Sequence, residues 1–239
     1  MRVVGANRCK VVSLKLSILF TAIVALPCAL IGCSSLEGQP LTYLALGDSY
    51  TIGESVAERE RWPVQLASRL RKGGLDVADP AIIARTGWRT DELYEAALSD
   101  ERVGKGAFDL VSLLIGVNDQ YQGRNIGDYP QEFERLIEIA IASGARGKAS
   151  VFVLSIPDWG VTPCGREKAE TVRAEINAYN AIAKGVCDAY GIPFYDITEI
   201  SRRALEDSSL LASDDLHPSG AMYRLWAEMI VADVRERVR

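Results

Sequence analysis

A serine, a histidine and an aspartate of this chain have the types and surroundings that nucleophilic catalysis uses. Ser49 stands in the run Gly-Asp-Ser-Tyr (47–50), directly after an apolar stretch. His217 is the single histidine of the chain, and Asp214 precedes it by three residues. A serine hydroxyl needs a base to take its proton, and the base needs a carboxylate to orient it, as in a Ser-His-Asp triad. The three residues therefore indicate covalent catalysis on Ser49.

Each of these residues also has a structural interpretation. Ser and Asp are favoured at helix N-termini, so Asp48 and Ser49 could merely cap the helix that follows. A single histidine is often structural, but His217 precedes the C-terminal helix in a predicted loop, where catalytic groups concentrate. Within one turn, we expect Asp214 to contact one ring nitrogen of His217 while the other faces Ser49. Asp215 is expected to point elsewhere.

Alternating apolar and amphipathic runs predict the elements that must position these residues. Strands are expected at 41–46, 81–84, 110–115, 151–155 and 192–195, and helices at 63–72, 91–98, 129–142, 166–190 and 220–238. Five such units predict an α/β fold of three α/β/α layers, with a five-stranded parallel sheet in a flavodoxin-like order. In these sheets, sites form at the carboxyl ends of the strands.

Two of the predicted helices carry apolar stripes that we assign to the core and not to a cofactor site. The members in 129–142 and in 220–238 are, respectively, Phe133, Leu136, Ile137, Ala140 and Ile141, and Met222, Leu225, Trp226, Met229 and Ile230.

Polar or glycine-bearing sequences follow the first four predicted strands. They read Gly-Asp-Ser-Tyr (47–50), Arg-Thr-Gly-Trp (85–88), Gly-Val-Asn-Asp (116–119) and Pro-Asp-Trp-Gly (157–160). Ser49 does not lie in a Gly-x-Ser-x-Gly elbow, which excludes the usual α/β-hydrolase turn. With Asp-x-x-His (214–217), the first three of these sequences (Gly-Asp-Ser-Tyr, the glycine of the second loop and Gly-x-Asn-Asp) resemble the GDSL or SGNH hydrolase family over essentially all of residues 41–239. Tyr50, where the family name has Leu, is a mild departure.

The resemblance implies a role for each matching residue. Ser49 would be the nucleophile, His217 the base and Asp214 its orienting carboxylate. The oxyanion hole would consist of the N–H groups of Ser49 and Gly87 and the side-chain amide of Asn118. Each such donor typically lowers the barrier by about 3 kcal/mol. Of these assignments, Gly87 is the one that an ordinary turn glycine explains equally well.

The loop at 155–163 looks like the corresponding loop of lysophospholipase-like members of the family. By position we expect it, with Tyr121 and Trp88, to form a wall of the acyl or leaving-group pocket, surface packing being the alternative. No cofactor is implied. A metal site is not expected, because the chain has one histidine and no paired Cys motif.

The resulting interpretation is a serine esterase that hydrolyses carboxylic esters, lysophospholipid among them, through an acyl-Ser49 intermediate. One alternative is a deacetylase or acyltransferase acting on cell-envelope glycans, because the same acyl-enzyme can react with water or with a sugar hydroxyl. An alternative of another class is a catalytically inactive envelope-binding module. The expected partner is a small-molecule or lipid ester, and pocket shape decides the acyl chain length and the leaving group.

The first 32 residues have the layout of a secretory signal. Four basic residues precede the apolar run 16–32 and none of the acidic residues does. Leu-Ile-Gly-Cys (30–33) resembles the bacterial lipoprotein signal, which implies a lipid on Cys33. An uncleaved membrane anchor is the alternative, but spanning needs about 17 residues at least and Pro27 interrupts the run.

We therefore expect a signal peptide at 1–32, a short lipid-anchored linker at 33–40 and one hydrolase domain at 41–239. The linker spans no more than about 30 Å when extended, so the lipid would hold the domain close to a membrane. The expected location is the bacterial cell envelope. Ser34, where an Asp would favour inner-membrane retention, points to the outer membrane of a two-membrane cell.

Charge and cysteine usage narrow the remaining classes. Residues 33–239 carry 23 Lys and Arg against 32 Asp and Glu, a formal net charge of −9, which disfavours nucleic acid as a partner. Cys164 and Cys187 flank the predicted helix 166–190, whose ends would lie about 30 Å apart. Because bridged Cα atoms lie within about 7 Å, we do not expect a disulfide between them.

Overall fold

The computed structural model describes residues 39–238. The predicted signal peptide, the lipid site at Cys33 and most of the linker 33–40 lie outside these residues. Within the described part, no helix is long and apolar enough to cross a membrane.

The described residues form a sheet of five parallel strands in the order β2-β1-β3-β4-β5. The strands are β1 Tyr43–Gly47, β2 Ala81–Ala84, β3 Leu110–Leu114, β4 Val151–Leu154 and β5 Phe194–Tyr195. This is the predicted flavodoxin-like order. Every residue of β1, β3 and β4 is buried, because helices cover both faces, and continuous apolar strands are the result.

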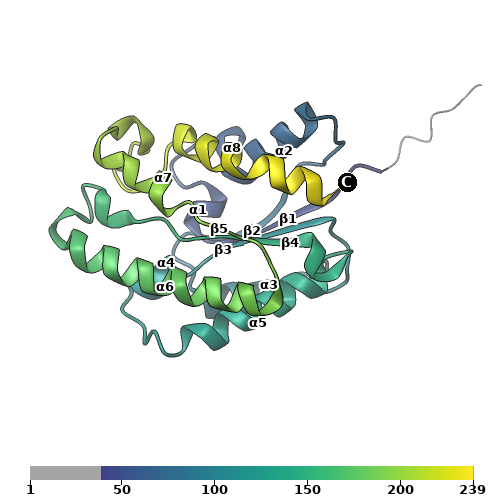
Figure 1. Cartoon of the computed structure of the whole chain (residues 1–239), viewed down its shortest axis with the longest axis horizontal. Coiled ribbons are helices and arrows are strands. Elements are labelled where there is room, and N and C mark those ends of the chain that lie inside the picture. The colour runs from purple at the N-terminus through teal and green to yellow at the C-terminus, as the bar shows by residue number, and fades with distance from the viewer. Residues whose placement is uncertain (1–38, 239) are drawn as a thin grey trace, which may run out of the picture. The chain divides into compact units, whose positions relative to one another are not determined.

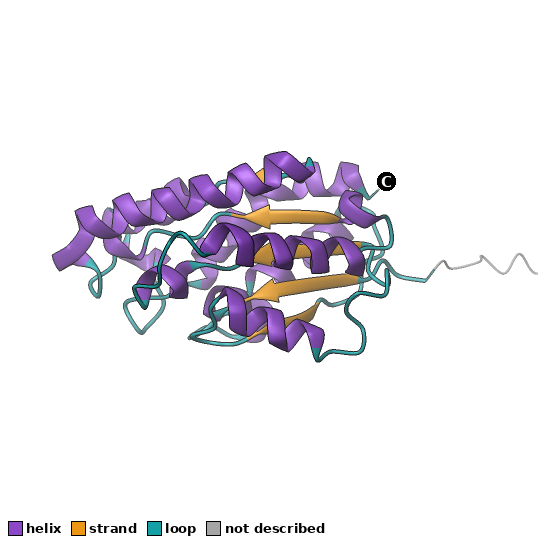
Figure 2. Cartoon of the chain, turned by 90° about the horizontal axis from the view of Figure 1, so that it is seen from below, coloured by secondary structure: helices purple, strands orange, loops and turns teal. Residues whose placement is uncertain are grey.

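Helices cover the sheet on both faces (Figures 1 and 2). The longer ones are α2 Trp62–Lys72, α3 Thr90–Leu98, α5 Tyr129–Ser143, α6 Ala169–Tyr190 and α8 Gly220–Arg237. The pair α2 and α8 covers one face, and α3, α5 and α6 cover the other. All five were predicted, α6 beginning three residues late because 166–168 form a 3₁₀ turn. The short helices α1 Ser49–Ile52, α4 Val117–Tyr121 and α7 Thr198–Arg202 were not predicted.

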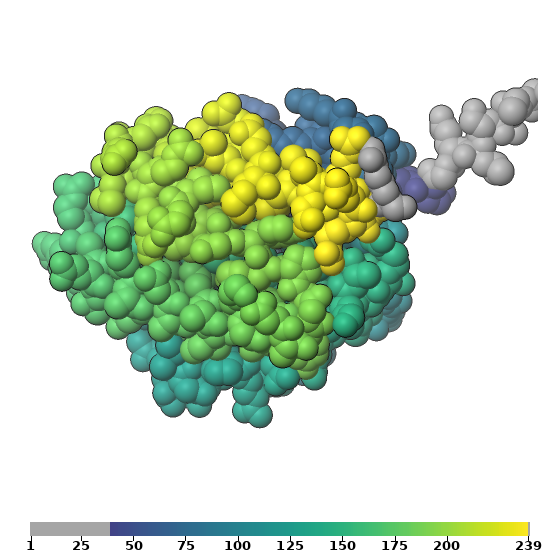
Figure 3. All heavy atoms as spheres, in the orientation of Figure 1, coloured from purple at the N-terminus to yellow at the C-terminus, as the bar shows by residue number. Residues whose placement is uncertain are grey.

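The core stripe predicted for α8 is wrong in one position. Met229 is 41% exposed, whereas Tyr223, which the prediction left out, is fully buried. Apolar residues occupy a wide arc of this helix, so the sequence period alone does not select the inner face. Packing against α2 selects it: the two helices lie side by side, yellow against blue in Figure 3, and Arg69 bonds Glu228 at 2.9 Å.

Three neighbouring strands of the sheet, β2, β1 and β3, end at the same level. Gly47 at the end of β1 pairs with Ala84 of β2 and with Leu114 of β3. A Cβ atom on Gly47 would lie 2.2 Å from the Thr51 hydroxyl and 2.5 Å from the Leu114 carbonyl oxygen, so only glycine allows α1 to fold back so closely. The loops that carry Ser49, Gly87 and Asn118 therefore start beside one another.

Candidate active site

Ser49 is the first residue of α1, but it does not cap this helix. Asp48 is the N-cap, and its Oδ1 accepts a 3.0 Å hydrogen bond from the N–H of Tyr50. No described residue hydrogen-bonds the Ser49 hydroxyl, and Ser49 lines a cavity at the carboxyl edge of the sheet. Capping and presentation of the serine thus fall to two neighbouring residues, which separates the two interpretations of this motif.

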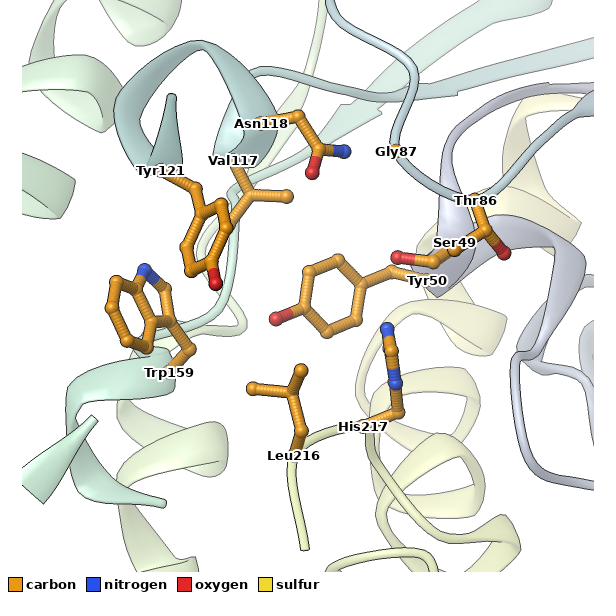
Figure 4. Close-up of a pocket in the computed structure, with 10 residues that line it drawn as sticks. All are labelled: Ser49, Tyr50, Thr86, Gly87, Val117, Asn118, Tyr121, Trp159, Leu216 and His217. Atoms are coloured by element: carbon orange, nitrogen blue, oxygen red, sulfur yellow. The ribbon is translucent and has the colours of Figure 1, made fainter. Parts of the chain in front are cut away.

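The cavity has a volume of about 240 Å³ and is lined by residues that follow β1, β2, β3 and β4 and by residues of the loop before α8 (Figure 4). Its walls are largely apolar. Tyr121 and Trp159 stand edge to face with ring centroids 5.2 Å apart. The lining residues are Ser49, Tyr50, Thr86, Gly87, Val117, Asn118, Tyr121, Trp159, Leu216 and His217. Ser49 and His217, 168 residues apart in sequence, therefore face one space, as do the two further residues predicted for the oxyanion hole.

Asp214 holds the ring of His217. The Nδ1 atom of His217 lies 2.7 Å from Oδ2 of Asp214, while Oδ1 accepts the N–H groups of Leu216 and His217 at 3.0 and 2.9 Å. Because a carboxylate only accepts, Nδ1 carries the hydrogen, and Nε2 of the neutral ring is an acceptor on the side of Ser49 (Figure 4). Asp215 takes a left-handed φ of 57°, which turns the chain between the two partners.

The carboxylate of Asp214 is strongly stabilised as an anion. Partial burial acts to raise its pKa, but hydrogen bonds from Ser55, from the backbone and ring of His217 and from Leu216 outweigh burial and hold the pKa well below its usual range. Asp214 is therefore charged throughout the physiological range, as a partner for an imidazolium ion must be.

Gly87 and Asn118 meet at the other side of the cavity. Gly87 lies in the turn closed by the 3.2 Å bond from the Trp88 N–H to the Arg85 carbonyl, and its φ of +84° is the reason for glycine, since a Cβ there would contact nothing within 4 Å. Neither the N–H of Gly87 nor that of Ser49 bonds another described residue. The Nδ2 of Asn118 donates to the Trp88 carbonyl at 2.9 Å and keeps a second hydrogen.

The wall predicted from the aromatic residues is correct only in part. Tyr121 and Trp159 line the cavity, but the side chain of Trp88 does not. Trp88 acts through its backbone carbonyl, which fixes the Asn118 amide. The Trp88 side chain is instead partly buried and packs against the hydrophobic core, which the sequence spacing did not indicate.

Two further aspartates of the motifs, Asp48 and Asp119, are fully buried and do not line the cavity. Burial raises the pKa of Asp48 to about 8. The hydrogen bond from the Tyr50 N–H lowers this pKa and the charge of Asp119 raises it, each by less than burial does. Oδ2 of Asp48 has no hydrogen-bond partner among the described residues. Asp119 receives the N–H and hydroxyl of Thr90 and a bond from Arg124 at 3.0, 2.7 and 3.0 Å. Burial still raises its pKa. Each of the two is the sequence neighbour of a lining residue, Ser49 or Asn118, and holds the backbone behind it.

Ser55 and Glu54 contact the site and were missed from the sequence. The Ser55 hydroxyl donates to Oδ2 of Asp214 at 2.6 Å, and Thr86 donates to the Glu54 carboxylate. The left-handed Gly53 that ends α1 is a recognisable signal that the chain turns near Ser49. No signal in the sequence pairs Ser55 with a residue 159 positions later.

The described residues contain no group of three or more His, Cys, Asp or Glu side chains placed to hold a metal ion. Cys164 is exposed and Cys187 buried, and both are free thiols.

Comparisons with known proteins bear on this arrangement. A model of the GDSL-like lipase/acylhydrolase family matches residues 45–225, which include every residue described at the site. No curated protein matches the sequence significantly.

Solved structures of the same fold include three hydrolases. A variant of the acetyl xylan esterase from Geobacillus stearothermophilus is 17% identical with a TM-score of 0.64, covering 82% of this chain and 95% of that chain. A lipase from a goat rumen metagenome is 21% identical with a TM-score of 0.64, covering 83% and 100%. The lipase/acylhydrolase from Enterococcus faecalis is 20% identical with a TM-score of 0.60, covering 82% and 96%. At these identities the likeness shows the fold.

Proposed function

The chain belongs to the GDSL-like lipase/acylhydrolase family, and from this premise we propose that it is a serine esterase hydrolysing carboxylic esters through an acyl-Ser49 intermediate. The observation that carries the proposal is a single cavity that receives Ser49, the backbone of Gly87, Asn118 and a His217 ring held at 2.7 Å by Asp214. A catalytically inactive envelope-binding module would have no need of an imidazole held by a carboxylate beside a serine whose hydroxyl bonds none of the described residues.

In the first step, the Ser49 oxygen attacks the ester carbonyl carbon and its proton passes to Nε2 of His217. The Ser49 hydroxyl and the ring do not hydrogen-bond in this structure, and we expect the serine side chain to rotate toward Nε2 when substrate enters. Asp214 stays ionised and stabilises the imidazolium that forms, in keeping with its lowered pKa.

The negative charge that develops on the carbonyl oxygen requires fixed donors. The N–H groups of Ser49 and Gly87 and the second hydrogen of Asn118 Nδ2 supply them. These donors are preorganised, because the turn at Gly87 and the Asn118–Trp88 bond fix their directions before substrate binds.

Collapse of this intermediate releases the alcohol, which takes its proton from His217 and leaves an acyl group on Ser49. Water then attacks the acyl carbon while Nε2 of His217 accepts its proton. The second intermediate breaks when His217 returns this proton to the Ser49 oxygen, which gives the carboxylic acid, free Ser49 and a neutral His217. Both halves use the same donors and the same base.

The shape of the cavity favours a small apolar acyl group. Its volume of about 240 Å³ is modest, and Val117, Tyr121, Trp159 and Leu216 line it. Longer acyl chains, such as that of a lysophospholipid, need the aromatic pair to move. We therefore expect short acyl esters to be turned over fastest.

A second candidate, deacetylation of or acyl transfer to an envelope glycan, is favoured by one observation. A neighbouring cavity of about 490 Å³ shares Tyr121 and Trp159 and is lined by Gln120, Glu167, Lys168 and Glu175, side chains suited to sugar hydroxyls. The fold neighbour from Geobacillus stearothermophilus is by its name an acetyl xylan esterase.

A fluorophosphonate probe tests the proposal directly. We expect it to label the folded wild-type domain on Ser49 and to leave Ser49→Ala unlabelled; an unlabelled, folded wild type contradicts an active serine hydrolase. Aryl esters from acetate to long chains, tested beside lysophospholipid and acetylated glycan, then rank the substrates, and added sugar acceptor distinguishes transfer from hydrolysis.

We also propose that the protein is exported and anchored in the cell envelope by a lipid on Cys33. The support is the basic, apolar and Leu-Ile-Gly-Cys order of residues 1–33. Radiolabelled palmitate should be incorporated into the wild type expressed in a bacterium and not into Cys33→Ala. Equal labelling of the two proteins excludes this site.

A further inference from the structure

The turn that follows α1 places a second serine against the acidic member of the site. Gly53 ends α1 with φ of 69°, and two residues later Ser55 takes φ of 64°. The Ser55 hydroxyl donates at 2.6 Å to Oδ2 of Asp214, the same oxygen that lies 2.7 Å from Nδ1 of His217. One carboxylate oxygen therefore joins the serine turn to the imidazole.

Ser55 differs from the other donors to Asp214 in its place in the chain. The backbone N–H groups of Leu216 and His217 and the His217 ring all belong to the loop that carries Asp214 itself. Among the described residues, Ser55 alone reaches this carboxylate from elsewhere, and it does so from the segment that begins at Ser49. The bond thus fixes the acid and base relative to the nucleophile.

The backbone at Ser55 indicates that the hydroxyl has a purpose there. A left-handed φ is unfavourable for a residue with a Cβ, and glycine adopts it without strain. A turn selected for stability alone would carry glycine at this position, as it does at Gly53. Serine keeps the strain and contributes the bond to Asp214.

The neighbouring side chain makes an equivalent link. Glu54 accepts a hydrogen bond from Thr86, which directly precedes Gly87 and lines the cavity. Two consecutive residues of one turn therefore hold the loop of the base and the loop of the oxyanion donor.

We propose that Ser55 is a positioning residue of the hydrolase reaction, an inference that rests on the proposed function. Its hydroxyl orients Asp214, and hence the His217 ring, toward Ser49 and limits the basicity of the carboxylate. Without it, Asp214 is a stronger base, the imidazolium keeps its proton to higher pH, and the ring is less well directed.

The test uses Ser55→Gly and Ser55→Ala in the full-length protein, after the wild type has shown turnover of an aryl acetate. Both variants lose the hydroxyl, while only the glycine variant relieves the left-handed φ. We expect kcat to fall about tenfold in both, the value of one hydrogen bond to a charged group, with KM within about twofold. We also expect the pH of half-maximal kcat to move upward. The glycine variant should melt at the higher temperature.

Ser209→Ala is the matched control, because the exposed Ser209 hydroxyl also bonds an aspartate, Asp207, at 2.5 Å and lies outside the cavity. It should retain the wild-type kcat and pH profile. The proposal is overturned if Ser55→Gly is folded and keeps the wild-type kcat, or if its kcat falls with no change in the pH profile. A wild type with no esterase activity rejects the proposed function instead, before either variant is compared.

Discussion

Asp48 and Asp214 each belong to a motif of the site, yet their surroundings shift their pKa values in opposite directions. Asp48, next to Ser49 in sequence, is fully buried and does not line the cavity; one of its oxygens is bonded, the other has no partner among the described residues, and its pKa is raised to about 8. Asp214 lies at the rim, where four hydrogen bonds reach its two oxygens and hold its pKa low. Donors, more than distance from the nucleophile, decide which aspartate can act as an anion.

Adjacent residues of α4 repeat this contrast. Asn118 faces the cavity, while Asp119 faces the interior and binds Thr90 and Arg124. Residues that contact the reacting groups, such as Asp214 and Asn118, should therefore control the rate of the proposed reaction. Buried aspartates such as Asp48 should control the free energy of unfolding and its dependence on pH. The following experiments examine this division in order of decreasing effect on activity.

Asp214→Asn should have the largest effect of these variants. The amide would donate toward Nδ1 and impose the wrong tautomer on His217, so we expect kcat to fall about 10³–10⁴-fold, as in other triads. Aryl acetate turnover and circular dichroism measure activity and folding. Asp215→Asn is the control, since its left-handed φ suits asparagine, and it should stay near wild type. Equal losses in the two variants would contradict the assignment of Asp214.

Asn118→Ala should come next. It removes one donor from the oxyanion hole without touching the base, so we expect kcat to fall about 10²–10³-fold with little change in KM. The matched control is Asn125→Ala in the exposed turn to Gly127, which should keep full activity. If Asn118→Ala turned over substrate at the wild-type rate, the amide would be only a structural link to Trp88.

Thr86→Val should lower the activity by a smaller factor. The loss of its bond to Glu54 loosens the turn of Gly87, and we expect kcat/KM to fall about two- to fivefold, the range of one partly exposed hydrogen bond. Glu54→Gln, with Thr86 intact, keeps an acceptor for the Thr86 hydroxyl and should retain most of the activity. A wild-type rate in Thr86→Val shows that the turn at Gly87 holds itself.

Asp48→Asn should change activity least and stability most clearly. The folded protein keeps a proton on Asp48 up to about pH 8, whereas the unfolded chain releases it near the ordinary value of 3.8. Since the folded state binds more protons between these values, this group lowers the free energy of unfolding as pH rises, by up to about 1.4 kcal/mol per unit. The variant should lose that slope.

Urea unfolding of wild type and Asp48→Asn at pH 5 and pH 8 measures this difference, because the other titrating groups cancel between the two proteins. We expect the variant to gain relative stability at pH 8 and to change kcat at pH 7 by less than about threefold. If the free energy of unfolding changed equally between pH 5 and pH 8 in the two proteins, Asp48 would be ionised in the folded protein. Asp214 has the opposite effect on the pH dependence of stability. Because its pKa is lowered in the folded protein, its contribution to the free energy of unfolding is lost as pH falls below the ordinary carboxyl range.

Much of the fold could be predicted from the sequence, because buried parallel strands and amphipathic helices have clear periods. The strands around Leu113 and Val153 and the stripe around Leu136 were found on that basis. The inner face of α8 was not, since its apolar arc is wide and the position of α2 selects Tyr223 over Met229. Short helices such as α1 depend on a single cap and turn and have no period to detect.

Several residues that line the cavity, among them Ser49, Gly87 and Asn118, could also be predicted from the motifs, which follow strands that end side by side. What the sequence could not indicate were contacts that depend on the exact course of a loop. Ser55 reaches Asp214 through two left-handed residues, and Trp88 offers a carbonyl instead of its ring. Such contacts arise from backbone direction, which the residue types leave open at these points.

The bond between Ser55 and Asp214 joins positions 159 residues apart, and this has a consequence for synthesis. A ribosome makes Ser49 168 residues before His217. A nascent protein that has not reached residue 217 therefore carries the proposed nucleophile with no base, and the loop of His217 is held in place only when α8, which follows it, has packed beside α2. Folding of this later segment is thus the step that would switch on the proposed hydrolysis.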